Sequence, residues 1–547
     1  MEQYTYESLP NADSIRLLFV EPVQDRGDDV KCSLRSSPIG RETEYLALSY
    51  SWGMDDGDAS ICERIIIDGK ALGVTRNLFD GLRRIFARKE FQKPIWIDAV
   101  CIDQKNVEER SSQVARMREI YSHAKQVLCW LGDGSDKREN DNIASVVKCF
   151  NSPHSDFQEH ELVLPDGSMS YTCEVFAVTS LVRYDMSGFN PENNLKFNSR
   201  SHLDRIWNLL GTDVLGPALR EASRAAASLL CKRYWNRLWV VQELFHARES
   251  ATLLWADHFM QEEQLQVLCD SDLAWKDSRF WNRFTLATLK RQLENMYVFR
   301  NNFHVSEHPQ KLLSLRQRPK DSILTLSSAI STCSTFECSD PRDRVYSLLS
   351  LDPSCTIRPD YNQSPAQVYV EFAIGDQKRF GSSNHLLWWT VTSRQLGPHD
   401  NLQASLPSWC PDIRVSKNKS PMQDFNVSSF SGEWEADEFG QLKATTRIMG
   451  ALNHDKELVL SNTTEHMWLT GSSPIRLDFY CDSKERCQQR DLVCAFQDSL
   501  TSFSGMGAIV LHPLEDEETV YRVVGAVAFL APEVYLHEYP ISTVRIR

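Results

Sequence analysis

The chain has 547 residues, of which 42% are hydrophobic and 24% are charged, a composition typical of a soluble globular protein. Its formal net charge is −14 and no long basic run is present, which argues against binding to nucleic acid or to an acidic membrane surface. The N-terminus is polar and acidic, and no apolar run of about 18 residues occurs, so neither a secretory signal nor a membrane span is expected. Fifteen scattered cysteines without C-x-x-C pairs indicate reduced thiols in a cytoplasmic protein, with no metal site.

The first part of the chain alternates strands and helices. Strands are predicted, in chain order, at residues 45–50, 64–67, 71–74, 94–97 and 126–131. Asp68-Gly69 is a favoured hairpin turn pair, Thr75 can cap a helix, and Asn106 with Glu109 resembles a capping box. This alternation predicts a parallel sheet covered by helices.

The rest of the chain changes character along its length. Residues 135–205 contain Asn- and Ser-rich patches and are interpreted as an insertion. A helix is expected before residue 235 and a strand at residues 251–255. The following region is mainly helical, with a helix start at Asp340-Pro-Arg-Asp343, and the last part has the short alternating segments of a β-rich module.

The segment Arg237–Leu244 is unusual because it places Gln-Glu directly within an apolar run. On a helix, one face carries Leu238, Val241 and Phe245. Trp239 and Glu243 are i, i+4 neighbours on a different side. This pair has three interpretations: a solvent-exposed coincidence, a structural ion network with Arg110 or Arg237, or half of an active site.

Common catalytic signatures are missing. The sequence has no phosphate-binding loop, no G-x-S-x-G and no H-E-x-x-H, and Gly132-Asp-Gly134 lacks the third glycine of a dinucleotide fingerprint. Cys101 is expected in a strand as a buried structural thiol, and His123 as a packed or solvated helix residue. His246, close to Glu243, is a lesser candidate for a general base.

Three blocks occur in the order found in the fungal heterokaryon incompatibility (HET) domain, and the chain resembles that family. The blocks are Tyr45–Gly53, Pro94–Gln104 with its continuation to Gly132, and Arg237–Glu243. Pieces outside the domain are also similar, at Ile15–Leu18, Asp340–Tyr346 and Leu406–Trp409. The resemblance implies a role in non-self recognition and programmed cell death, an allelic or non-allelic incompatibility partner protein, and a candidate homo-oligomer.

Domain boundaries follow from this resemblance. We expect an N-terminal extension at 1–42, a HET domain at 43–248 with the insertion at about 135–205, a mainly helical region at 249–380 and a β-rich region at 381–547. The HET domain in turn resembles TIR domains, which implies an α/β fold with a flavodoxin-like parallel sheet.

The TIR resemblance also implies a reaction. Ser49-Tyr50 resembles the Ser-aromatic pair that ends the first TIR strand, and Trp239–Leu244 resembles the W-C-x-x-E-L motif, with Val240 in place of Cys. In TIR enzymes that glutamate supports cleavage of NAD at the nicotinamide–ribose bond. The resemblance therefore implies that Glu243 is catalytic, with NAD as a substrate and no cofactor.

Ligand-binding candidates follow two strands, because ligands in open α/β sheets bind beyond the carboxyl ends of the strands. The candidates are Ser49, Tyr50, Trp52, Gly53, Asp98, Asp103 and Trp239. Trp52 or Trp239 can stack on an aromatic ring. Alternatively, Trp52 and Trp96 pack in the core or in turns, and Asp98 and Asp103 stabilise a loop. Two functions stay open: an NAD-hydrolysing effector, and a non-catalytic module that self-associates and recruits a downstream death effector.

Overall fold

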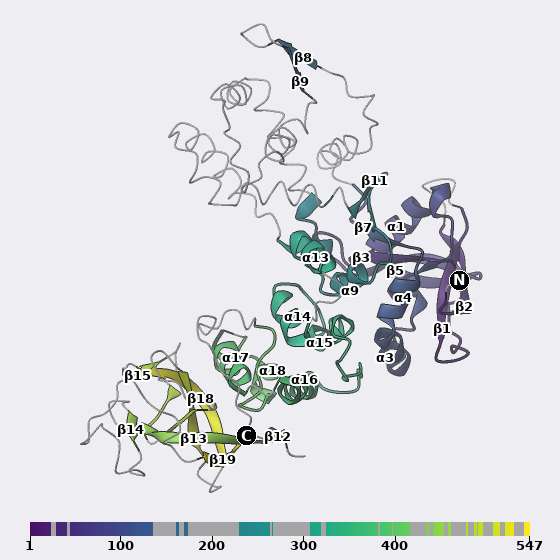
Figure 1. Cartoon of the computed structure of the whole chain (residues 1–547). Coiled ribbons are helices and arrows are strands. Elements are labelled where there is room, and N and C mark those ends of the chain that lie inside the picture. The colour runs from purple at the N-terminus through teal and green to yellow at the C-terminus, as the bar shows by residue number, and fades with distance from the viewer. Residues whose placement is uncertain are drawn as a thin grey trace. The chain divides into compact units, whose positions relative to one another are not determined.

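The structure is a computed structural model of the whole chain (Figure 1). It describes residues 1–22, 29–40, 44–134, 160–163, 169–172, 229–262, 265, 307–318, 324–380, 383–396, 398–415, 434–436, 441–452, 458–460, 477–479, 486–489, 491–495, 507–514, 520–529 and 541–547. The chain divides into two compact units, residues 1–319 and 320–547.

Unit 1 is built on a nine-stranded sheet with the strand order β11-β10-β7-β3-β6-β1-β2-β4-β5. The strands are β1 (Ser14–Val20), β2 (Lys31–Pro38), β3 (Leu46–Tyr50), β4 (Ile61–Ile67), β5 (Lys70–Thr75), β6 (Ile95–Trp96), β7 (Gln126–Trp130), β10 (Thr252–Trp255) and β11 (His258–Gln261). The adjacent strands β10, β7, β3 and β6 run parallel. The predicted α/β class is confirmed, and the parallel strands form the centre of a mixed sheet.

Strands outside the predicted parallel set complete this sheet. β1 pairs antiparallel with both β6 and β2, and β2 runs parallel to β4. The two strands before residue 43 are therefore part of the same sheet as the rest of unit 1. At the other edge, β11 pairs antiparallel with β10.

Local signals fix the predicted hairpin and helix starts. Asp68 and Gly69 have φ angles of 49° and 81°, the left-handed pair that a tight hairpin turn requires. Thr75 Oγ1 accepts the Leu78 N–H and begins α1 (Arg76–Phe86), as predicted. Asn106 Oδ1 accepts the Glu109 N–H at 3.1 Å and begins α3 (Val107–Ala115).

Two predicted details of this region are wrong. The Glu109 carboxylate does not complete a capping box with Asn106, because it accepts the Asp103 N–H at 2.8 Å and pairs with Arg16 at 2.5 Å. Cys101 is not in a strand: it ends the short helix α2 (Asp98–Cys101), which begins directly after β6.

The remaining helical elements of unit 1 are η1 (Lys89–Phe91), α4 (Met117–His123), η2 (Arg233–Asn236), α9 (Trp239–Phe245) and α13 (His308–Arg316). α9 packs against α4, β3 and α13, and its residues 240–244 are all buried. The apolar face predicted for this helix is thus only part of its buried surface. A two-stranded antiparallel sheet, β8 (His160–Val163) with β9 (Met169–Thr172), lies within the predicted insertion, the rest of which is outside the described residues.

Unit 2 confirms the predicted order of a helical part followed by a β-rich part. Its helices are α14 (Leu326–Thr332), α15 (Asp343–Tyr346), η3 (Leu349–Leu351), α16 (Pro365–Phe380), α17 (Ser383–Leu396) and α18 (Asn401–Ser405). An eight-stranded sheet follows, with β12 (Trp434–Ala436), β13 (Leu442–Leu452), β14 (Leu458–Leu460), β15 (Leu477–Phe479), β16 (Leu492–Ala495), β17 (Gly507–Pro513), β18 (Val520–Phe529) and β19 (Ile541–Ile546). The helix predicted to start at Asp340 starts at Asp343, because Asp340 Oδ1 accepts the Arg342 N–H in a preceding turn.

Among the described residues, no helix is long and apolar enough to cross a membrane. In the same residues, no group of three or more His, Cys, Asp and Glu side chains is arranged to hold a metal ion.

Candidate active site at the carboxyl end of β3

Ser49 and Glu243 meet where β3 ends. Ser49 is the second-to-last residue of β3, and Glu243 lies in α9, 194 residues further along the chain. Both residues are 1% exposed, and the Ser49 hydroxyl donates a hydrogen bond to Oε2 of Glu243. The two motif blocks that are farthest apart in the sequence therefore place one hydroxyl and one carboxyl group in direct contact.

Arg237 supplies the positive charge next to this pair. Its Nη1 donates to the backbone carbonyl of Tyr50, and its Nη2 lies 3.9 Å from Oε1 of Glu243. Burial opposes the charge of the guanidinium, but Glu243 and Asp98 raise the pKa of Arg237 above its ordinary value. Arg237 therefore remains a cation and is the ion-pair partner of Glu243.

The carboxyl group of Glu243 has an unusual proton affinity. Burial raises its pKa from 4.5 to about 7, and the nearby Asp98 adds to the rise, while Arg237 and the Ser49 hydrogen bond oppose it. Protonated and ionised forms are therefore both populated near neutral pH. A carboxyl group with this pKa is suited to gain or lose a proton during a reaction.

Asp98 and Trp52 lie on the exposed side of the set. Asp98 begins α2, where its Oδ1 accepts the Ala99 N–H at 2.7 Å and its Oδ2 accepts the Trp52 indole N–H at 3.0 Å. Burial raises the pKa of Asp98, and Arg237 opposes that rise. Trp52 is 40% exposed. The side chains thus range from an exposed aromatic ring, through a half-buried carboxylate, to the buried Glu243.

Tyr50 adds a buried hydroxyl group beside these charges. Burial and the nearby Asp98 carboxylate raise its pKa well above the ordinary value, so the phenol is neutral. Within the described part of the chain, its hydroxyl has no hydrogen-bond partner. A buried hydroxyl without a partner costs about 1–3 kcal/mol.

Tyr234 supports Ser49 from the opposite side. Its hydroxyl lies 2.7 Å from Ser49 Oγ and also hydrogen-bonds the Cys129 thiol. Glu243, Ser49, Tyr234 and Cys129 therefore form a continuous buried row of hydrogen-bonding groups. An ionised Glu243 can only accept a hydrogen bond from Ser49, whereas a protonated Glu243 can also donate one. The direction of the hydrogen bonds along this row therefore depends on whether Glu243 carries a proton.

The loop after β3 is fixed by backbone contacts. Asn77 Nδ2 donates to the Ser51 carbonyl at 2.6 Å, and its Oδ1 accepts the Trp130 indole N–H at 2.9 Å. A Cβ atom on Gly53 would lie 3.1 Å from the Gly57 carbonyl oxygen, so a larger residue would require the backbone there to shift by a few tenths of an ångström. The predicted binding residue Gly53 thus has a clear role in shaping the loop.

Some predicted site residues lie apart from the Ser49–Glu243 contact. Asp103 Oδ1 accepts the Lys105 N–H at 3.1 Å, and its own N–H donates to Glu109, so Asp103 belongs to the loop before α3. Trp239 is half-buried in the first turn of α9.

The remaining candidate acid–base and nucleophilic groups are poorly suited to these roles. Burial lowers the pKa of His246 to about 4, so its ring is neutral at physiological pH. Burial raises the pKa of the Cys101 thiol to about 12, which excludes a ready thiolate nucleophile. His123 is at the exposed end of α4, with Nδ1 2.9 Å from the Glu119 carbonyl.

The fold and the site define a class: an α/β domain whose candidate site lies at the carboxyl end of a central parallel strand. The profile of the family described as "Heterokaryon incompatibility protein (HET)" matches residues 45–243. This range begins just before β3 and ends at Glu243, so it contains every residue in direct contact with Ser49 described above. The similarity to the HET family therefore covers residues 45–243 of the chain.

Two curated proteins are similar to parts of the chain. Heterokaryon incompatibility protein 6, OR allele, from Neurospora crassa is 36% identical over 175 residues, which cover 29% of this chain and 25% of that protein. Vegetative incompatibility protein HET-E-1 from Podospora anserina is 31% identical over 117 residues, which cover 21% of this chain and 8% of that protein. The matched part thus spans a quarter or less of either relative. No solved structure matches the chain significantly.

Proposed function

We propose that the chain acts in heterokaryon incompatibility, where it contributes to non-self recognition and cell death by hydrolysing NAD at the nicotinamide–ribose bond. The names of both similar proteins support the incompatibility role. The observation that carries the proposed reaction is the buried Glu243, which has a pKa of about 7 and is held by Ser49 at the end of a parallel strand.

The proposed reaction uses Glu243 in its ionised form. The bond between ribose C1 and nicotinamide N1 breaks, its electron pair stays on N1, and neutral nicotinamide leaves. The carboxylate stabilises the oxocarbenium-like ribose electrostatically. A water molecule then forms the C1–O bond and loses a proton to Glu243, which gives ADP-ribose, nicotinamide and one proton overall. The positive nicotinamide ring of bound NAD favours the ionised carboxylate before the bond breaks.

The surrounding residues would bind and orient the substrate. The Tyr50 hydroxyl and the Asp98 carboxylate are suited to hydrogen-bond ribose hydroxyls, and the exposed Trp52 ring is suited to stack on a base. Trp239, one turn before Glu243, is a further aromatic candidate. Ser49 and Arg237 orient Glu243, while Gly53 and Asp103 shape the loops around it.

Nicotinamide release from NAD by the purified full chain tests this proposal. We expect turnover by the wild-type protein and none above background by Glu243→Gln, which keeps the size of the side chain but removes its charge. Absence of turnover by the wild-type protein, even after forced oligomerisation, would contradict the enzymatic proposal. Turnover that survives Glu243→Gln would instead contradict the residue assignment.

A second candidate function is a non-catalytic module that self-associates and recruits a death effector. It is favoured by the contacts of Glu243 with Ser49 and Arg237, which also suit a purely structural link between α9 and β3. Fungal cells expressing Glu243→Gln distinguish the two functions. Cell death and self-association both persist in the variant if the module is non-catalytic, whereas cell death is lost and self-association persists if the module is an enzyme.

A further inference from the structure

We infer that Arg316 of α13 is a positioning residue for Glu243, and that the functional domain extends beyond the family match at residue 243 to include α13. The catalytic part of this inference rests on the proposed function. Its structural part, that Arg316 fixes the end of α9, does not.

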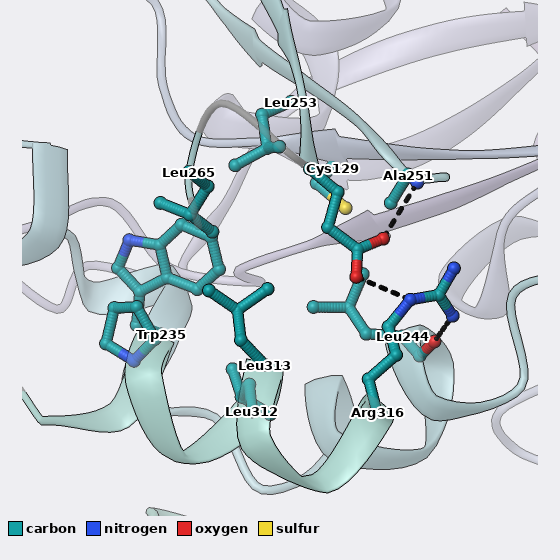
Figure 2. A pocket seen from close by; sticks show the side chains of 11 residues that line it. Cys129, Trp235, Leu244, Ala251, Leu253, Leu265, Leu312, Leu313 and Arg316 are labelled. Carbon is teal, nitrogen blue, oxygen red and sulfur yellow. Dashed lines mark hydrogen bonds and ion pairs between the residues drawn. The ribbon is translucent and has the colours of Figure 1, made fainter. Parts of the chain in front are cut away.

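The guanidinium of Arg316 contacts the carbonyl groups at the end of α9. Nη1 donates to the Leu244 carbonyl and, at 2.8 Å, to the Ala247 carbonyl, and Nη2 donates to the Glu249 carbonyl at 2.7 Å. Figure 2 shows Arg316 reaching from its helix toward Leu244. One side chain therefore fixes three carbonyl groups within six residues.

These contacts matter because α9 has only seven residues. The last carbonyl groups of a helix lack partners within the helix, and a helix this short is not stable by itself. A cation at the C-terminus also interacts favourably with the helix dipole. Arg316 meets both requirements, and the first carbonyl that it binds belongs to Leu244, the residue next to Glu243.

Arg316 is itself tied to the sheet through an ion pair. Its Nε lies 2.5 Å from Oε1 of Glu262, and Oε2 of Glu262 accepts the Ala251 N–H at 3.1 Å, directly before β10 (Figure 2). The two side chains are 17% and 13% exposed, so solvent screens this pair only partly. The end of α9 is thus held at a fixed place relative to the strand next to β7.

Other contacts place α13 along the whole Glu243 segment. His308 Nδ1 lies 2.8 Å from Asn236 Oδ1, at the end of η2. Leu312 and Leu313 line a small apolar cavity together with Trp235 and Leu244, as Figure 2 shows. α13 therefore contacts residues both before and after Glu243. Because Arg316 binds the carbonyl of Leu244, a shift of α13 would displace the end of α9 that carries Glu243.

Geometry of this kind affects catalysis steeply, because displacement of a reacting group by about 1 Å can cost on the order of a hundredfold in rate. We therefore expect Arg316→Gln to lower kcat on the order of tenfold or more, with a smaller change in KM. The pH at which kcat/KM is half-maximal should also move, because a displaced Glu243 changes its burial and its Ser49 hydrogen bond, both of which set its pKa.

The experiment compares Arg316→Gln with Arg318→Gln, a matched control at an exposed position just beyond α13. Hydrogen–deuterium exchange of the amides at 242–249 and nicotinamide release from NAD are measured on the full chain. We expect several-fold faster exchange and reduced kcat in Arg316→Gln, and neither change in the control. Unchanged exchange together with unchanged kcat in Arg316→Gln would overturn the inference.

Two further outcomes keep the test decisive. If Arg316→Gln does not fold, Glu262→Gln replaces it, because this variant removes only the charge that holds the guanidinium. We expect smaller changes in the same direction in amide exchange and kcat. No change in either quantity would overturn the inference. If the wild-type protein releases no nicotinamide, the proposed function fails, while the exchange measurement alone still decides whether Arg316 fixes α9.

Discussion

The substitution Glu243→Gln should stabilise the folded protein at alkaline pH while abolishing turnover. Burial raises the pKa of Glu243 from 4.5 to about 7, so between these pH values the folded protein holds a proton that the unfolded chain has lost. Stability then falls as the pH rises through this window. The ionised carboxylate is a net cost to folding even with Arg237 beside it, and glutamine removes that cost.

The size of the effect follows from the same pKa. A rise from 4.5 to about 7 corresponds, at about 1.4 kcal/mol per pKa unit, to about 3 kcal/mol above pH 7. Most of the gain should be absent at about pH 5, where Glu243 is already protonated in the folded protein. The assay is the melting temperature of the wild-type chain and the variant at about pH 5 and about pH 8.5, where we expect a difference of several degrees only at the higher value.

Glu108→Gln is the control, because Glu108 is an exposed glutamate in the first turn of α3. It should change the melting temperature little at either pH. A loss of stability in Glu243→Gln at alkaline pH would refute the reasoning. Such a loss would mean that the ion pair with Arg237 contributes more than burial costs, as in a purely structural link.

Three further predictions concern the groups around Glu243. The value of kcat/KM should increase with pH as Glu243 ionises, and Tyr234→Phe should raise the midpoint of this increase by less than about one pH unit. Tyr121→Phe is the control and should leave the midpoint unchanged, because the Tyr121 hydroxyl binds a backbone carbonyl. Trp52→Ala should raise the KM for NAD without lowering the melting temperature, because the ring is 40% exposed. Asn77→Ala should destabilise the protein by about 1–3 kcal/mol in urea unfolding, because it leaves a buried indole N–H and a carbonyl without partners.

The parts of the fold that could be predicted are those set by neighbours in sequence. The Asp68-Gly69 turn and the Thr75 cap depend on residues within a few positions, and both are as predicted. The insertion of β1 between β6 and β2 depends on contacts between distant segments, so periodicity gives no sign of it. The apolar run through Cys101 predicts a strand, although Asp98 begins a helix there.

The same distinction applies to the candidate site. Ser49 and Asp98 could be chosen because they lie at the carboxyl ends of strands, and Glu243 because its motif resembles a known one. The contacts that set the proton affinity of Glu243 could not be read in this way. Tyr234 is 185 residues from Ser49, and nothing in the Arg-Tyr-Trp-Asn segment that contains it signals a catalytic environment. Arg316 likewise lies in a helix with no recognisable motif.

The placement of Arg237 explains why Glu243 and Arg237 do not form an ordinary buried ion pair. A guanidinium that binds a carboxylate through two parallel hydrogen bonds lowers the carboxylate pKa strongly. Here one nitrogen of Arg237 is directed to the Tyr50 carbonyl, and the other stays 3.9 Å from Glu243. The attraction is therefore too weak to offset burial, and the pKa stays at about 7. A backbone carbonyl at the end of β3 thus keeps Glu243 able to exchange a proton near neutral pH, which favours a chemical role for it over a structural one.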